Sequence, residues 1–393
     1  TVVTSGAEDN QTVYVAFDNG DNYTGTVSNN STSVTFATGI LNALTDGDNY
    51  TLRTNVSDAA GNAATVNTGT SFKYDRTPPS ISAVAITGED GIQNNFLNVG
   101  DNVSVTVTFS ENSPVTGTPQ LTLAVGDENQ PANYTSSGNG GTTLVFQYMI
   151  QAEDNDTNGI SIRANALALD NGTIMDLAEN NATLTHSVVD NNSSYKVDTI
   201  PPSVDNFTMS DTELKIGDNA TVTLVFSEVV CGASSGCSLS QTGGTDFSNA
   251  DITVPNLDSG PRTGIASGTL TTMTSDDNET WRGTFTPEIN AEDNSSRLSL
   301  ATSYTDLAGN NGPDNQTANY AIDTLLPTIS SVTAGWGTYL NATEDNSTGT
   351  VTVVTSGAED NQTVYVAFDN GDNYTGTVSN NSTSVTFATG ILN

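Results

Sequence analysis

Two sets of oxygen-bearing side chains recur along this chain at spacings that could do chemistry, and both favour binding or modification over catalysis. The first is the triplet Asn-x-Ser/Thr, whose asparagine amide accepts N-linked glycans when it is exposed. The second is a series of acidic clusters, whose carboxylate and amide oxygens are the ligands that Ca²⁺ prefers. Both sets need secondary-structure elements that hold polar side chains in turns or on the solvent-exposed face of a sheet.

The glycan acceptors are dense, with twenty triplets in one period of the sequence. A chain this rich in Asn, Ser and Thr forms such triplets by chance, and chance supplies about half of them. The remainder predicts N-linked glycans at several sites, although adjacent pairs are not expected to be occupied together. The triplets begin at Asn10, Asn22, Asn29, Asn30, Asn49, Asn55, Asn102, Asn133, Asn155, Asn171, Asn181, Asn191, Asn192, Asn206, Asn219, Asn278, Asn294, Asn315, Asn341 and Asn346.

The densest acidic stretch, Glu153–Gly159, places oxygen ligands at alternating positions before a glycine, like the first half of a calcium loop. Its twelfth position is Asn165 rather than glutamate, which excludes an EF-hand. One interpretation is structural Ca²⁺, favoured by the negative charge of the chain, and the other is a solvated acidic turn. The candidate ligands are Asp154, Asp156 and Asn158 in the loop, with Asp75, Asp198 and Asp323, which precede prolines.

Enzymatic chemistry is not predicted. His186 is the single histidine, expected on the surface of a strand, and no serine nucleophile elbow or phosphate-binding loop is present. Cys231 and Cys237 are the two cysteines, and no third cysteine or nearby histidine completes a zinc site. A small-loop disulfide in an oxidising compartment is the main interpretation, with two free thiols as the alternative.

The charge of the chain limits the classes of partner that it can bind. It contains 45 Asp and Glu residues and nine Lys and Arg residues, so its formal net charge is −36. Such a surface repels nucleic acid and anionic membranes and attracts divalent cations. No run of 18 apolar residues could form a membrane-spanning helix. Thr, Val, Asn, Ser and Gly dominate, which is a β composition with many turns.

The sequence contains one stretch twice: residues 1–42 recur unchanged as residues 352–393. Even the Asn-Ser-Thr tracts agree, so we interpret the chain as one 351-residue period, plus an overlap, of a longer array. Residue 1 corresponds to the middle of an alternating strand pattern, so both ends are expected to be arbitrary.

Three proline hinges divide this period, at Pro78-Pro79, Pro201-Pro202 and Leu326-Pro327. Proline fixes φ and removes a ladder donor, so it ends one sheet and stiffens the link to the next. We expect domain A (residues 1–78, its latter part), domain B (79–201), domain C (202–326) and the opening part of the next domain A (327–393, the A-repeat segment).

Strand patterns indicate the fold of each domain. Residues 103–109 and 220–226 alternate apolar with Ser or Thr side chains, as half-buried strands do. The stretches 58–62, 176–180 and 306–310 follow an Asp-x-x-Gly-Asn pattern, with Glu179 replacing glycine in domain B, and predict tight turns before the last strand. Short strands with regular turns and no helical pattern predict an all-β chain of tandem immunoglobulin-like antiparallel β-sandwiches.

The strand ending Thr108–Glu111, the stretch Gly117–Leu123, the turns and the hinges together resemble a known family. It comprises the bacterial and archaeal immunoglobulin-like tandem repeats of giant extracellular surface proteins of adhesin or swimming-associated type. The resemblance implies extracellular tandem sandwiches, often stiffened by calcium, without catalysis. This chain departs from the pattern at Leu326, which stands at the first proline position of its hinge, and in its density of glycan acceptors.

The predicted function is a non-catalytic repeat unit of a glycosylated extracellular filament at the cell surface, whose partners are copies of itself. The alternative is an adhesin stalk or a carbohydrate- or cell-binding surface protein. Domain A lacks residues equivalent to 327–351, and a sandwich without its opening strands exposes an unpaired edge. We therefore expect an adjacent copy to supply them, either in a continuous chain or by strand donation.

Overall fold

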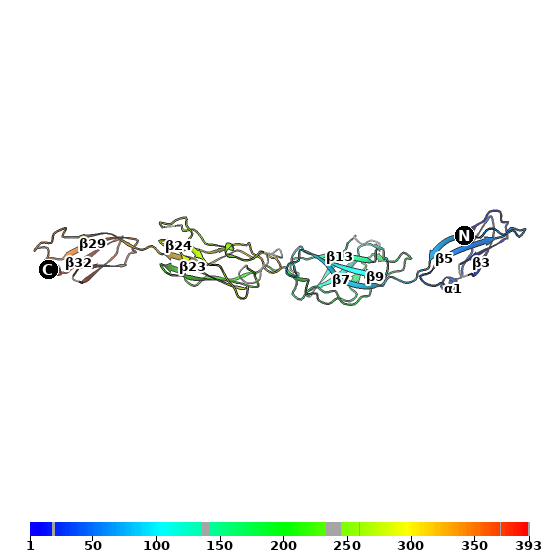
Figure 1. Cartoon of the computed structure of the whole chain (residues 1–393), viewed down its shortest axis with the longest axis horizontal. Helices are drawn as coiled ribbons and strands as arrows, with labels where there is room; N and C mark the ends of the chain where they lie inside the picture. The colour runs from blue at the N-terminus through cyan, green and yellow to red at the C-terminus, as the bar shows by residue number, and fades with distance from the viewer. Residues whose placement is uncertain (18–19, 136–140, 233–244, 259, 370, 392–393) are drawn as a thin grey trace. The chain divides into compact units, whose positions relative to one another are not determined.

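The computed structural model (Figure 1) describes residues 1–393 except 18–19, 136–140, 233–244, 259, 370 and 392–393. It divides into two compact units, residues 1–198 and 199–393, and every described sheet lies within a single one of the four predicted segments. Among the described residues, the elements other than one helical turn, α1 (Thr38–Leu41), and one 3-10 turn, η2 (Asn249–Asp251), are strands. The all-β sandwich prediction is therefore confirmed. None of the described helices has the length or hydrophobicity needed to cross a bilayer.

Domain B packs a six-stranded sheet, in the order β15-β11-β12-β13-β9-β7, against a three-stranded sheet, β14-β17-β8. Alternate residues of β9 are buried, as its sequence predicts, and Val105 shares one core with Leu97 and Val197 of the smaller sheet. Figure 1 shows β7, β9 and β13 together in this domain. Its strands are β7 (Ile81–Asp90), β8 (Phe96–Leu97), β9 (Asn102–Phe109), β10 (Val115–Thr116), β11 (Gln120–Val125), β12 (Glu128–Tyr134), β13 (Thr143–Met149), β14 (Asn155–Asp156), β15 (Leu167–Ala168), β16 (Thr173–Ile174) and β17 (Lys196–Asp198).

Domain C repeats this plan with a four-stranded sheet, β18-β20-β23-β22, and two three-stranded sheets, β19-β27-β24 and β21-β25-β26. Its core joins Leu224 and Trp281 of the first sheet to Leu214 and Ile322 of the second. Its strands are β18 (Val204–Met209), β19 (Glu213–Lys215), β20 (Ala220–Phe226), β21 (Ile252–Thr253), β22 (Gly268–Leu270), β23 (Thr280–Pro287), β24 (Glu292–Ser296), β25 (Ser299–Leu300), β26 (Asn315–Gln316) and β27 (Tyr320–Asp323).

Domain A has a four-stranded sheet, β3-β2-β5-β6, and a two-stranded sheet, β1-β4. Its apolar residues form two small clusters, one around Val13 and Val15 and one around Phe17, whose ring packs on Phe36 and Phe72. Its strands are β1 (Val2–Val3), β2 (Thr12–Ala16), β3 (Asn22–Thr26), β4 (Ser31–Thr32), β5 (Asn49–Val56) and β6 (Asn67–Lys73).

The A-repeat segment forms a three-stranded sheet, β28-β29-β32, and a hairpin, β30-β31. It includes the opening strand β28, which precedes the repeated 42 residues. Its strands are β28 (Thr328–Ala334), β29 (Gly349–Ser356), β30 (Thr363–Ala367), β31 (Asn373–Thr377) and β32 (Ser382–Phe387).

The repeated sequence adopts two different structures where its neighbours differ. In the A-repeat segment, residues 382–387 form the six-residue strand β32 along β29. In domain A the identical residues 31–36 form a strand only at Ser31–Thr32, paired with Val2–Val3. Strand pairing, not local sequence, thus decides the length of this strand.

The assignment of the buried face of domain C can be tested with two substitutions that shorten aliphatic side chains of equal size to alanine. Leu224→Ala removes a fully buried side chain and should lower the free energy of unfolding by about 2–5 kcal/mol, because it loses apolar burial and leaves a cavity. Ile216→Ala, at a side chain that is 51% exposed, should change it by about 0.5 kcal/mol or less. Urea unfolding followed by Trp281 fluorescence measures both, and equal effects would contradict the assigned core.

Candidate metal centre

The hinge after domain A brings three carboxylates together. Asp75 lies in the hinge, Glu111 follows β9, and Asp176 opens the turn that precedes the last strand of domain B. One carboxylate oxygen from each lies within 4.8 Å of the other two. Asp75 was predicted as a ligand from the sequence, whereas Glu111 and Asp176 were not. The signal that could have identified them is their recurrence, because Glu228 and Asp306 stand at the same motif positions in domain C.

Hydrogen bonds hold the hinge on both sides of this cluster. The Asp46 carboxylate, from the loop before β5, accepts hydrogen bonds from the Arg76 amide at 2.6 Å and from the Thr77 hydroxyl. On the other side, the Asn180 side-chain amide donates to the Asp75 carbonyl at 3.1 Å. The backbone that carries the Asp75 carboxylate is thus tied to both domains.

The turn that carries Asp176 is built to keep its carboxylate ionised. One oxygen accepts from the amides of Ala178 and Asn180, both at 2.8 Å, and the other accepts from the Asn180 side chain at 2.8 Å. Burial opposes ionisation, but these hydrogen bonds outweigh it and lower the pKa of Asp176. Glu179 takes the left-handed backbone conformation of the turn, where the equivalent turns have Gly61 and Gly309.

The surroundings of Glu111, in contrast to those of Asp176, disfavour the ionised carboxylate. Burial, together with the neighbouring carboxylates of Asp75 and Asp176, raises the pKa of Glu111. Lys73 is the nearby cation, and its ammonium group lies 2.8 Å from Asp75. The side chain of Lys73 is more than half exposed, so this ion pair neutralises the cluster only weakly.

The other two hinges preserve parts of the same arrangement. In domain C, carboxylate oxygens of Glu228 and Asp306 lie within 4.8 Å of each other. The predicted ligand Asp198 ends β17, opposite Asn155 of β14, and holds the sequence position of Asp75.

At the last hinge the predicted ligand Asp323 shares a hydrogen bond with Glu359, and burial and this second acid raise the pKa of Asp323. Glu359 repeats Glu8, and in domain A the Glu8 carboxylate accepts from the Ala59 amide at 2.9 Å. Ala59 follows Asp58 of the domain A turn. The repeated glutamate therefore lies beside the hinge acid in one copy and beside the turn acid in the other.

The two carboxylates predicted as ligands in the loop accept hydrogen bonds from protein donors instead of meeting other carboxylates. Asp154 accepts from the Tyr148 hydroxyl at 2.6 Å, the Gln151 amide at 2.8 Å and the Gln130 side chain at 2.8 Å. Asp156 accepts from three backbone amides, those of Gly126, Asn158 and Gly159. Asn158 is exposed and donates its backbone amide to Asp156 at 3.2 Å. These two buried carboxylates hold the loop through protein donors, which already occupy their oxygens.

The hinge cluster fits a hard divalent cation better than the loop does. Oxygens around Ca²⁺ at 2.3–2.6 Å lie up to about 5 Å apart, which matches the spacing of the cluster. Ca²⁺ takes six to eight oxygens, so three carboxylates would supply part of the shell and water the remainder. A cation would also relieve the repulsion that raises the pKa of Glu111.

The predicted glycan acceptors are all at least partly accessible. Asn55 and Asn278 are the poorest candidates, because their side-chain oxygens are buried. Half-buried acceptors are Asn55, Asn102, Asn192, Asn278 and Asn315. Exposed acceptors are Asn10, Asn22, Asn29, Asn30, Asn49, Asn133, Asn155, Asn171, Asn181, Asn191, Asn206, Asn219, Asn294, Asn341 and Asn346.

The predicted disulfide is described at one of its two ends. Cys231 is fully buried and disulfide-bonded, beside Gly232, where an added side chain would collide with the Trp281 ring. Cys237 lies outside the described residues, so the Cys231–Cys237 pairing stays a prediction.

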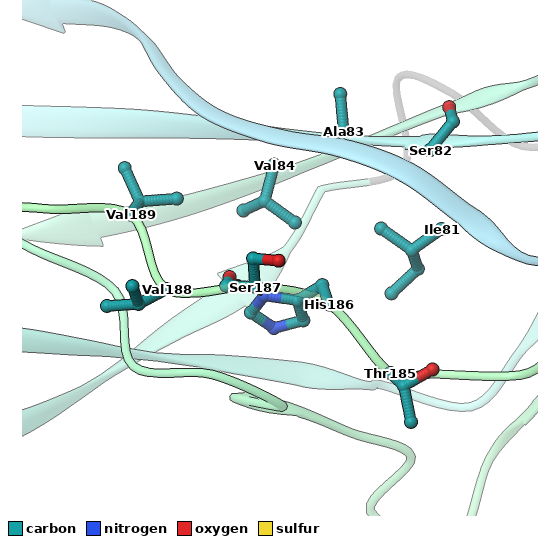
Figure 2. A pocket seen from close by; sticks show the side chains of 9 residues that line it. All are labelled: Ile81, Ser82, Ala83, Val84, Thr185, His186, Ser187, Val188 and Val189. Carbon is teal, nitrogen blue, oxygen red and sulfur yellow. Dashed lines mark hydrogen bonds between the residues drawn. The ribbon is translucent and has the colours of Figure 1, made fainter.

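His186 has a structural setting rather than a catalytic one. Its Nε2 accepts a hydrogen bond from the Ala166 amide at 2.9 Å, so the proton lies on Nδ1, which donates to the Ser187 carbonyl at 2.7 Å. It lies outside a strand, contrary to the expectation from its sequence. Figure 2 shows it beside a groove of about 420 Å³ between Ile81–Val84 of β7 and the segment Thr185–Val189. Both ring nitrogens are thus used within the domain.

Comparison with known proteins identifies the fold. Residues 198–322 match a bacterial Ig-like domain family. Among curated proteins no match was found.

Three solved structures are similar at low identity. A bacterial ice-binding adhesin of 1.5 MDa, studied for retention on the host cell surface, is 19% identical, over 78% of this chain and 87% of that one, with a TM-score of 0.31. A tetra-tandem repeat from the extending region of a large adhesion protein is 14% identical, over 98% and 86%, with a TM-score of 0.28. SGBP-B of Bacteroides ovatus, in complex with a mixed-linkage heptasaccharide, is 10% identical, over 99% and 94%, with a TM-score of 0.14.

Removing one charge tests the repulsion in the cluster. The pKa of Glu111 is raised, so its ionised form destabilises the folded state at neutral pH, and this penalty disappears as the pH falls below the ordinary range of glutamate. Without divalent cations, Glu111→Gln should therefore raise the free energy of unfolding at pH 7, by about 0.5 kcal/mol or less because solvent screens the site. The gain should shrink as the pH falls through the carboxylate range.

Urea unfolding in a chelating buffer measures this effect. The matched control is Asp127→Asn, which removes a charge from an exposed turn of the same domain outside the cluster. A loss of stability in Glu111→Gln under these conditions would contradict the electrostatic description.

Proposed function

We propose that this chain is a non-catalytic structural unit of a glycosylated extracellular fibre, built from tandem bacterial Ig-like sandwiches whose junctions are stiffened by divalent cations. The observation that carries the proposal is the convergence of the hinge acid Asp75 with Glu111 and Asp176 of the following domain. A site made by a linker and the next sandwich has the geometry to control a junction.

The mechanism is mechanical. Each sandwich resists extension through its paired strands, whereas the hinge is a short segment between them. Proline already limits the rotations of this segment. A cation held by Asp75, Glu111 and Asp176 would add a cross-link between the hinge and domain B, while Asp46 fastens the hinge to domain A. Bending at the hinge would then require breaking cation–oxygen contacts.

The same arrangement extends to the other two hinges of the period. In domain C, Glu228 and Asp306, which lie close together, would provide the two carboxylates that Glu111 and Asp176 provide in domain B. At the third hinge, Asp323 would join Glu359 and the counterpart of Asp58 in a complete domain A. One cation at each hinge would offset part of the charge of −36 and keep the stiffness uniform along the array.

Glycans and negative charge would keep such a shaft soluble and resistant to proteases. Strands as well as turns offer accessible acceptors, for example Asn22 in β3 and Asn206 in β18. A fibre of this kind belongs outside the cell, at its surface, where its partners are further copies of the repeat.

Calcium addition tests the proposed hinge site. Ca²⁺ should raise the melting temperature of the chain, and a chelator at fixed ionic strength should reverse the increase, because only the folded state assembles the three carboxylates. At a Ca²⁺ concentration about 100 times Kd the stabilisation is about 2.7 kcal/mol, and each kcal/mol corresponds to roughly 4 °C. Calorimetry gives the shift, and small-angle scattering shows whether the chain becomes more flexible on chelation.

Two substitutions separate the site from a general charge effect. Asp75→Asn and Glu111→Gln should each reduce the calcium-induced shift, whereas Asp127→Asn should leave it unchanged. If all three variants respond as the parent chain does, calcium is acting by screening and the hinge site is wrong.

Glycan occupancy should follow accessibility. In the protein isolated from its natural source, Asn22→Gln should remove the mass of one glycan, because Asn22 is exposed on β3. Asn278→Gln should leave the intact mass without such a loss, because the Asn278 side-chain oxygen is buried. Intact-mass spectrometry decides this, and an unmodified polypeptide mass in the parent would contradict glycosylation altogether.

A further inference from the structure

We propose that a groove in domain B binds an extended peptide segment of a partner protein, with an uncharged centre and basic ends. The groove lies between the first strand of the domain, β7, and residues 185–189, and it has a volume of about 420 Å³. Such a site adds a partner to a chain whose proposed role is structural. All of its lining residues belong to domain B, and the site does not depend on cation binding or on glycans.

Domain B differs from domains A and C in the segment that forms one wall of this groove. The turn acid Asp176 and the hinge acid Asp198 are 22 residues apart, whereas the equivalent acids of domains A and C are 17 residues apart. In domain C the shorter segment places β26 beside β18, which is the counterpart of β7. In domain B the longer segment leaves a groove along β7. The additional residues thus give domain B a feature that the repeated sandwich plan does not require.

Both walls of the groove present backbone groups without a partner. β7 lies at the edge of the six-stranded sheet, and within the described residues its outer edge pairs only at the preceding residue, Ser80, with Thr183. Across the groove, the backbone amides of Thr185 and Ser187 donate no hydrogen bond within the described part of the chain. An unpaired strand edge is a template for an extended peptide, whose own amides and carbonyls complete the ladder.

The wall opposite β7 is held in place by hydrogen bonds on its far side. The backbone amide of His186 donates to the Asn165 side chain at 3.0 Å, and the His186 carbonyl accepts from the Asn165 amide at 3.3 Å. The imidazole accepts from the Ala166 amide at 2.9 Å. Further along, Val189 exchanges two hydrogen bonds with Ile162. The groove is therefore part of the folded domain before a ligand arrives.

These hydrogen bonds also set the direction of the unpaired amides. Residues 184–188 contain no helix or turn, and neighbouring amides of an extended segment point to opposite edges. The amide of His186 points to Asn165, so the amides of Thr185 and Ser187 point towards the groove. A peptide in the groove would accept hydrogen bonds from this wall on one edge and pair with β7 on the other.

The base of the groove is apolar, which favours small or β-branched side chains in the ligand. Figure 2 shows the side chains of Ile81 and Val84 between β7 and the opposite wall, and both pack on the core of domain B. Val189 packs on the same core from the opposite wall, while Val188 is 55% exposed. Because side chains alternate along a strand, a bound peptide would place every second side chain against this apolar base.

Charge determines which peptides the groove accepts. None of the residues that line it is Asp, Glu, Lys or Arg, so an uncharged segment leaves no charge unpaired there. Domain B as a whole has 14 acidic residues and two basic ones, Arg163 and Lys196. Its acids attract basic residues beyond the ends of the segment and repel an acidic ligand. The same repulsion disfavours a second copy of this chain, with its charge of −36, as the partner.

A labelled peptide of alternating valine and threonine, with a lysine at each end, tests the groove in the full chain. It should bind in a fluorescence anisotropy titration, and it should slow hydrogen exchange at the amides of Thr185 and Ser187. A second peptide, N-methylated at alternate residues, keeps the side chains and the charge but cannot complete the ladder. It should bind about tenfold more weakly, because it loses backbone hydrogen bonds.

Two substitutions in domain B match each other in residue type, exposure and charge. Val188→Lys places a cation on the wall of the groove and should weaken binding of the first peptide about threefold to tenfold. Val99→Lys, at a side chain that is 52% exposed and does not line the groove, should leave the affinity unchanged. Both positions are exposed, so both variants should melt within a few degrees of the parent chain.

Three results would overturn the docking site. They are the absence of peptide binding, equal affinity for the N-methylated peptide, and equal weakening by the two lysine variants, since the last two indicate general charge attraction. If a neutral oligosaccharide protects Thr185 and Ser187 from exchange and the peptide does not, the groove is a glycan site and the peptide assignment is wrong. None of these measurements involves calcium, so their failure leaves the proposed structural role of the chain unaffected.

Discussion

Repulsion between the carboxylates of Asp75, Glu111 and Asp176 is the constraint on which the junction after domain A depends. One carboxylate oxygen from each of these acids lies within 4.8 Å of the other two. Burial and the two neighbouring carboxylates raise the pKa of Glu111, whereas hydrogen bonds lower the pKa of Asp176. The hinge and two loops of domain B have to be fixed in place for the acids to remain so close. In the proposed function, a cation of charge +2 held between these carboxylates would replace their mutual repulsion with attraction.

The sandwich architecture explains why the acids meet at this position. Glu111 follows the end of a buried central strand, and Asp176 opens the turn before the last strand, so both lie at the end of domain B that receives the hinge. The Asp-x-x-x-Asn turn has nearly the same hydrogen bonds in domains A, B and C, with Asp58 and Asp306 in the role of Asp176. A repeated fold thus reproduces the same acidic end at each junction.

The fold could be predicted from the sequence in most respects, whereas the site could be predicted only in part. Alternation in β9 and β20 is a local signal, and it predicted the buried faces correctly. The spacing of Asp154 and Asp156 suits calcium, which is why they were predicted as ligands. Their donors, however, come from elsewhere in the fold, Tyr148 from β13 and Gly126 from the turn between β11 and β12, and local sequence cannot place them. Glu111 and Asp176 were missed for the same reason, since 65 residues separate them and only the fold brings them together.

The two copies of the repeated segment separate local preference from tertiary context within one molecule. Residues 31–36 and 382–387 have identical side chains, so any difference between them comes from their neighbours. The extra strand length in β32 appears where β29 is long enough to pair with it, and Phe387 is buried there while Phe36 is not. Because β propensity is equal in both copies, it cannot account for the longer strand. The free energy that extends the strand must therefore come from the backbone pairing and burial that residues 328–351 supply.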